Sequence, residues 1–188
     1  KWEIIDGQHR VMTAMKLNIP ITYCMERKSN EKTMRTLNTG GDNWLMNDHL
    51  HGLVEDGNPH YVKLQNFMKE FPELKITECL MLCKNMYTSV PRGTFESGEF
   101  TTRDMNIART WGGYVMRMKP FAKYYNSGIF VRALIVCLGK ECFNFEEFIH
   151  KVELRPTSLV KCGTREQYIQ LFENIYNYRR SDKVNLRY

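Results

Sequence analysis

The sequence predicts an α+β fold that is mostly helical. Its first 36 residues have the pattern of a strand, a tight turn, a helix and a second strand, and residues 37–188 have the pattern of a helical region with a basic C-terminal tail. Two observations lead to this prediction. An apolar pair runs into an Asp-Gly turn at positions 4–7, and apolar residues recur at helical spacing through most of the remaining chain.

Each element of the N-terminal module has a local cause. Ile4 and Ile5 have the apolar character of a buried strand, and Gly7 can take backbone angles that are closed to other residues. Residues 11–17 have the composition of a helix, which Asn18 and Pro20 then interrupt. The alternating apolar residues at positions 19–25 predict the second strand.

The turn between the first strand and the helix is predicted to bind an anion. The free N–H groups of a first helical turn favour negative charge, and a guanidinium adds a donor fork suited to phosphate. The candidate phosphate-binding residues are Gly7, Gln8, His9 and Arg10. The alternative is a purely structural turn in which Arg10 caps the helix or pairs with Asp6.

The same segment resembles the core of the ParB/sulfiredoxin-like superfamily. The Asp-Gly-Gln-His-Arg run at 6–10, the helix from Val11 and the Ile-Pro-Ile run at 19–21 are similar to phage and mobile-element members of it. The resemblance implies a DNA-associated module that binds a nucleotide such as CTP. It also implies that strands and a helix of the module lie upstream of Lys1. Sulfiredoxin activity is excluded because Gln8 stands where that chemistry needs a cysteine.

A second site position is implied only by the resemblance. Asn38 matches the asparagine of the family's Glu-Asn-x-x-Arg motif, which helps to hold a nucleotide and its magnesium. Leu37 replaces the glutamate and Gly41 replaces the arginine. Magnesium prefers carboxylate oxygens, so the CTPase or nuclease activity that the resemblance implies lacks its metal-binding group, and no catalytic residue is assigned. The alternative is that Asn38 only begins a turn.

The rest of the chain is predicted to be helical. Apolar stripes and breaker residues predict helices over residues 44–54, 60–71, 76–86, 102–118, 143–154 and 164–178, and one helix or a pair of helices over residues 121–138. We expect a loop or small hairpin at residues 91–100, and an interruption of the fourth helix at Gly112 and Gly113.

Composition and cysteine spacing narrow the class of protein. A hydrophobic content of 43% supports a packed core, and no apolar run is long enough to span a membrane. The six cysteines, at positions 24, 79, 83, 137, 142 and 162, lack the paired two-residue spacing of a structural zinc site. We therefore expect buried free thiols, no metal and a cytoplasmic location.

The charge of the chain favours an acidic partner. The formal net charge is +6 and the sequence pI is about 9.0. The candidate nucleic-acid-binding residues, which are interleaved with tyrosines in the tail, are Arg179, Arg180, Lys183 and Arg187. A second basic stretch consists of Arg103, Arg109, Arg117 and Lys119. The alternative for the tail is that its cations offset a helix dipole and keep the protein soluble.

Taken together, these patterns predict a ParB-like, DNA-associated protein of phage or mobile-element origin. It would bind a nucleotide or phosphate through the Gly-Gln-His-Arg turn, with DNA as its partner and a homodimer left open. The alternative is a non-enzymatic structural or protein-interaction protein that keeps the same scaffold.

Overall fold

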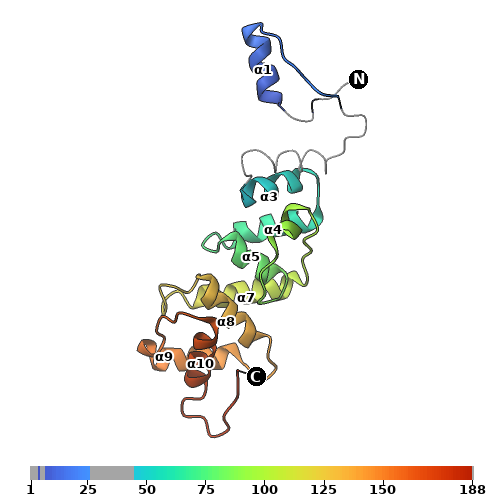
Figure 1. The fold of residues 1–188 in the computed structure, drawn as a ribbon. Helices are drawn as coiled ribbons and strands as arrows, with labels where there is room; N and C mark the ends of the chain where they lie inside the picture. The colour runs from blue at the N-terminus through green and yellow to red at the C-terminus, as the bar shows by residue number, and fades with distance from the viewer. Residues whose placement is uncertain (1–3, 5–6, 26–44, 188) are drawn as a thin grey trace. The chain divides into compact units, whose positions relative to one another are not determined.

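The computed structural model describes Ile4, residues 7–25 and residues 45–187 (Figure 1). The α-helices are α1 (Gln8–Leu17), α3 (Met46–Glu55), α4 (Pro59–Glu70), α5 (Ile76–Cys83), α6 (Arg92–Glu96), α7 (Met105–Arg117), α8 (Gly128–Leu138), α9 (Phe145–Leu154) and α10 (Arg165–Tyr176). A 3₁₀ turn, η1 (Pro156–Ser158), follows α9. The chain divides into two compact units, Lys1–Gly52 and Leu53–Tyr188. The boundary expected between residues 36 and 37 lies outside the described residues.

The α+β prediction is wrong, because the described part of the chain contains helices and no strand. The helix of the expected strand-turn-helix-strand module is present as α1. Residues 19–25, however, carry no regular structure, and Ile4 is not in a strand. A strand is stabilised by hydrogen bonds to a neighbouring strand, and the described residues offer none. The alternating apolar side chains of residues 19–25 are consequently exposed.

The helices predicted after residue 44 are confirmed to within a few residues, except that only α8, from Gly128, forms within the predicted 121–138 segment and residues 121–127 are not helical. Local capping explains several of their starting points. The side chain of Asn58 accepts a hydrogen bond from the His60 amide at the start of α4. Thr164 and Gln167 form a reciprocal capping box at the start of α10. None of the described helices is long and apolar enough to cross a lipid bilayer.

The segment predicted as a loop or hairpin at residues 91–100 contains the short helix α6 instead. Its stability comes from tertiary contacts rather than from its length. Phe95 is fully buried, and the hydroxyl of Tyr61 donates a 2.6 Å hydrogen bond to its carbonyl oxygen. The ring of Phe100 meets that of Tyr61 edge-on. The sequence pattern missed α6 because its one buried side chain leaves no periodic stripe.

Helix α7 runs without interruption through Gly112 and Gly113, so the break predicted there is wrong. The two glycines have different surroundings. A Cβ atom on Gly112 would lie 2.9 Å from the Phe71 ring, whereas one on Gly113 would meet nothing within 4 Å. Gly112 is therefore a site of close packing between α7 and the end of α4, where any larger side chain collides with an aromatic ring.

Aromatic rings join the last three helices. Phe130 of α8 packs against Tyr168 and Phe172 of α10, with ring centroids 5.3 Å apart in both pairs. Phe172 also contacts Phe148 of α9 at 5.2 Å. All four side chains are almost completely buried. This cluster fixes α10, and therefore the residues that follow it, against α8 and α9.

All six cysteines are free thiols. The prediction of burial is confirmed for Cys79, Cys83 and Cys137, but Cys24 and Cys142 are exposed. Burial raises the pKa of both Cys79 and Cys137 to about 12, and it also raises the pKa of Cys83.

We predict that Gly112→Ala destabilises the protein by about 1–3 kcal/mol, because the added methyl group is forced against the Phe71 ring. Gly113→Ala is the matched control in the same helix. It should be neutral or stabilise by up to about 1 kcal/mol, since alanine is the better helix former. Urea unfolding followed by circular dichroism measures both. Equal effects of the two substitutions would show that the Phe71 contact is unimportant.

Candidate nucleic-acid interface

The predicted phosphate turn has the backbone geometry that glycine allows. Gly7 takes the left-handed conformation, with φ at 80°, immediately before α1. Its carbonyl oxygen accepts the Val11 amide at 2.9 Å, which closes the first helical turn. The Arg10 side chain folds back over this turn, since a Cβ atom on Gly7 would lie 3.3 Å from Nε and Nη2 of Arg10. The guanidinium is therefore beside the turn.

The side chains of Gln8, His9 and Arg10 are exposed, and Gly7 is half-buried. None of the described residues in the first turn of α1 is acidic. The N-terminus of α1 therefore has the partial positive charge that favours an anion. Asn38, Leu37 and Gly41, on which the resemblance places the rest of a nucleotide site, lie outside the described residues.

The second basic stretch is largely neutralised by ion pairs. The pairs are Arg109–Glu70, Arg117–Glu146 and Lys119–Glu73, each with a nitrogen–oxygen distance of 2.8 Å. In each pair a side-chain hydrogen bond from the cation lowers the pKa of the carboxyl group. This stabilisation is present above the ordinary carboxyl pKa and is lost as the pH falls through the lowered value. These cations join α7 and its following turn to neighbouring segments.

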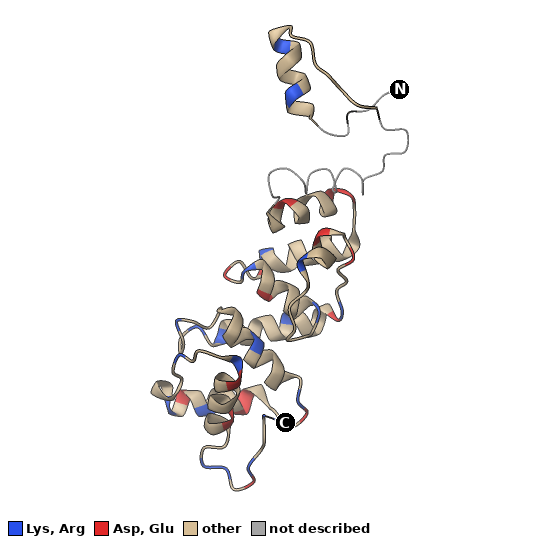
Figure 2. Cartoon of the chain, in the orientation of Figure 1, with Lys and Arg blue, Asp and Glu red and all other residues tan. Residues whose placement is uncertain are grey.

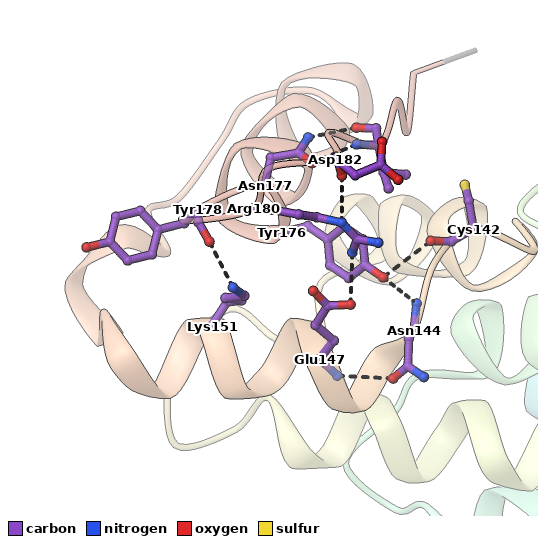
Figure 3. A network of polar contacts seen from close by, with 10 residues as sticks. Cys142, Asn144, Glu147, Lys151, Tyr176, Asn177, Tyr178, Arg180 and Asp182 are labelled. Atoms are coloured by element: carbon purple, nitrogen blue, oxygen red, sulfur yellow. Dashed lines mark hydrogen bonds and ion pairs between the residues drawn. The ribbon is translucent and has the colours of Figure 1, made fainter.

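Two of the four predicted tail residues are likewise paired with carboxylates. The first, Arg180, lies 2.9 Å from Glu147 of α9 and donates to the Asp182 carbonyl oxygen at 2.7 Å (Figure 3). A hydrogen bond to Tyr176 and the charge of Glu147 raise the pKa of Arg180. Arg180 therefore holds the tail against α9.

Glu173 of α10 anchors the other end of the tail. Its carboxylate is 2.9 Å from the Arg187 guanidinium and accepts the Leu186 amide at 2.7 Å. Both Glu173 and Leu186 are buried. Arg187 is thus engaged in tail docking, while Arg179 and Lys183 remain exposed and have no carboxylate partner among the residues that the structure describes.

Arg179 belongs to a cluster that the sequence did not reveal. Its Cζ atom lies 5.2 Å from the centre of the Tyr178 ring, and Cζ of Arg155 lies 4.6 Å from the same ring. Lys151 donates a 2.9 Å hydrogen bond to the Tyr178 carbonyl oxygen (Figure 3). We call Lys151, Arg155, Tyr178 and Arg179 the Tyr178 cluster.

A hollow of about 340 Å³ adjoins the Tyr178 cluster. Its wall includes Lys151, Arg155 and Tyr178, together with Thr157 and Ser158, which carry hydroxyls. Helical spacing in the sequence does not bring these residues together, because Lys151 lies in the last turn of α9 and Arg155 follows the end of that helix with non-helical backbone angles. Their meeting with Tyr178, more than twenty residues further along, depends on the packing of α9 against α10.

Within the described ranges, no group of three or more His, Cys, Asp or Glu side chains could hold a metal ion. No family model, curated protein or solved structure matches this chain.

We predict that Glu173→Ala releases the tail and costs about 1–3 kcal/mol, because a buried amide and Arg187 lose their acceptor. Hydrogen exchange at the Leu186 amide should accelerate strongly. Glu146→Ala, which breaks an exposed arginine pair, is the control and should leave that exchange rate unchanged. A Leu186 amide that stays protected in Glu173→Ala would contradict this account of tail docking.

Proposed function

We propose that this protein binds DNA through the Tyr178 cluster and the adjoining tail, and that the Gly7–Arg10 turn contacts phosphate. Residues 151–188 contain eight Lys and Arg but four Asp and Glu, which is a net charge of +4 out of the total of +6. Figure 2 shows basic positions spaced along this C-terminal part of the chain. Such a concentration of positive charge favours a polyanion.

The proposal rests on a difference between arginines, because some are positioned by carboxylates and others by an aromatic ring. Arg109 and Arg117 give their donor forks to carboxylates. Arg155 and Arg179 are instead held over the face of Tyr178. A ring orients a guanidinium without using its N–H donors, so these donors stay available for phosphate oxygens. The Thr157 hydroxyl of the 340 Å³ hollow offers a further donor, whereas the Ser158 hydroxyl donates to the Arg155 carbonyl oxygen at 2.7 Å.

The Gly7–Arg10 turn supports the same class of ligand from the N-terminal unit. Its left-handed glycine, its helix N-terminus and the guanidinium beside it suit an anion. Its resemblance to the phosphate turn of ParB-like proteins supports this choice. A cytoplasmic location forms part of the proposal, because six free thiols suit a reducing compartment.

We predict that Arg155→Gln/Arg179→Gln weakens binding to duplex DNA similarly for unrelated sequences. Each guanidinium that no longer neutralises a phosphate should lower the slope of log affinity against log salt by about 0.9, and the double variant by about 2. Fluorescence anisotropy with two labelled duplexes over a salt series measures this slope. The control is Arg109→Gln/Arg117→Gln, which removes the same charge from residues that are already ion-paired.

Equal changes of slope in both double variants would mean that only net charge matters, and would refute the assignment to the Tyr178 cluster. A protein with no measurable DNA affinity at low salt would overturn DNA binding itself. That result would favour a protein-interaction role. The observation for that role is the group of exposed apolar side chains on residues 12–25, among them Met15 and Tyr23 at 78% and 74% exposure.

For the turn, we predict that Arg10→Ala weakens binding of tripolyphosphate and CTP about ten- to a hundredfold, since a charge-assisted hydrogen bond is removed. Isothermal titration calorimetry measures the affinity. Arg103→Ala, another exposed arginine, is the control and should bind as the unmodified protein does. Full affinity in Arg10→Ala would place any phosphate site elsewhere.

A further inference from the structure

A second hollow, larger than the one beside the Tyr178 cluster, lies within the C-terminal unit. Its volume is about 510 Å³, which falls in the range of small-molecule sites. Residues from the loop after α5, from α7, from α8 and from the start of α10 line it. We call it the Tyr87 cleft, after the exposed tyrosine on its wall. None of the predicted phosphate-turn residues lies in it.

The Tyr87 cleft combines an apolar floor with two aromatic side chains. Ile135 of α8 and Ile169 of α10 are buried, and both line the cleft. Tyr87 is 44% exposed, and Trp111 of α7 is half-buried. An exposed tyrosine and a partly accessible indole beside apolar side chains suit a planar group, because aromatic faces stack on flat π-systems.

The rim of the cleft is basic. Lys140, Arg165 and Arg187 line it, and Glu166 is the one acidic residue of the lining. Arg165 bonds to Glu166 at 2.6 Å, and its Cζ atom lies 5.2 Å from the centre of the Tyr87 ring. Arg187 bonds to Glu173, which lies outside the lining. When Glu173 is counted, three cations and two carboxylates lie at the rim, and this excess of one positive charge favours an anionic ligand.

A ligand that fits both parts of the cleft has a planar group and a negative charge. We propose that the Tyr87 cleft binds a single nucleoside phosphate, with its base against Trp111 and Tyr87. Its phosphate would lie at Lys140 and at those N–H groups of Arg165 and Arg187 that do not bond Glu166 or Glu173. The nucleotide is either free or one unstacked unit of single-stranded DNA. Only the second source rests on the proposed DNA-binding function. The ring faces recognise any base, so the cleft is expected to discriminate weakly between bases.

Trp111 provides the signal for the test. The chain has three tryptophans, so replacing Trp2 and Trp44 by phenylalanine leaves Trp111 as the only indole. Titrating this protein with adenosine 5′-monophosphate should quench the Trp111 emission to saturation. Adenosine and inorganic phosphate, which each carry half of the ligand, should bind at least about tenfold more weakly. A single-stranded oligonucleotide forms a further arm.

Variants of the cleft then assign the contacts. Tyr87→Ala should weaken nucleotide binding about fivefold or more, in line with the removal of one base–aromatic stacking interaction. Tyr87→Phe, which keeps the ring, should bind as tightly as the unmodified protein. Arg165→Gln should weaken binding of the monophosphate but not of adenosine. Arg109→Gln, on α7 and paired with Glu70 outside the cleft, is the charge-matched control.

The arms separate the outcomes. Saturable quenching by the monophosphate supports a site for free nucleotide, and quenching by the oligonucleotide alone supports a nucleotide within a strand. Quenching by inorganic phosphate as strong as that by the monophosphate would overturn base recognition. Absence of quenching in every arm would overturn the cleft as a nucleotide site. Because Tyr87→Ala leaves the Tyr178 cluster intact, its salt slope on duplex DNA tests the proposed function independently.

Discussion

The packing of aromatic rings between α8, α9 and α10 is the constraint on which the C-terminal unit depends. Phe130 touches both Tyr168 and Phe172, and Phe172 reaches Phe148, so one buried cluster joins three helices. Large rings bury much apolar area with few rotatable bonds, which makes such a cluster rigid. The position of residues 177–187 depends on this cluster. Arg180 and Arg187 of the tail bind Glu147 and Glu173, so their positions depend on α9 and α10.

Two groups of arginines in the C-terminal unit differ in their main partners. Those on α7 lie opposite glutamates of other segments and act as links between helices. Those around residues 155–180 lie on tyrosine rings, and only some also have a carboxylate. The first arrangement neutralises the charge internally, and the second keeps it directed outward. The sum of charges in the sequence therefore overstates the basic surface near α7 and describes the tail region better.

The helices could be predicted because each one buries a stripe at helical spacing. Tyr61, Leu64 and Phe67 of α4 are all fully buried, as their spacing indicated. The strand at residues 19–25 was predicted from alternating apolar and polar residues. This pattern does not show whether a second strand is present to form hydrogen bonds with it. The break predicted at Gly112 was wrong because the sequence alone does not distinguish a glycine that ends a helix from one that makes room for a neighbouring ring. For the candidate site, the left-handed turn at Gly7 follows from one residue and its neighbours, so it could be predicted.

Other parts of the candidate site depend on tertiary structure and could not be predicted. The tail arginines were found by composition, but the division between docked Arg180 and exposed Arg179 depends on where Glu147 lies. Lys151 and Arg155 reach Tyr178 only through the packing of α9 on α10, and no local pattern carries that information.

The burial of three thiols has a consequence for how this protein can be handled in the laboratory. The thiolate is the form that reacts with alkylating reagents, and Cys79 and Cys137, with pKa values of about 12, are almost entirely protonated at neutral pH. Cys24 and Cys142 are exposed and are the positions that a thiol-specific dye reaches first. The rate at which the three buried thiols are alkylated would then report the rate of opening of the C-terminal unit. Mass spectrometry measures this rate without any engineered label.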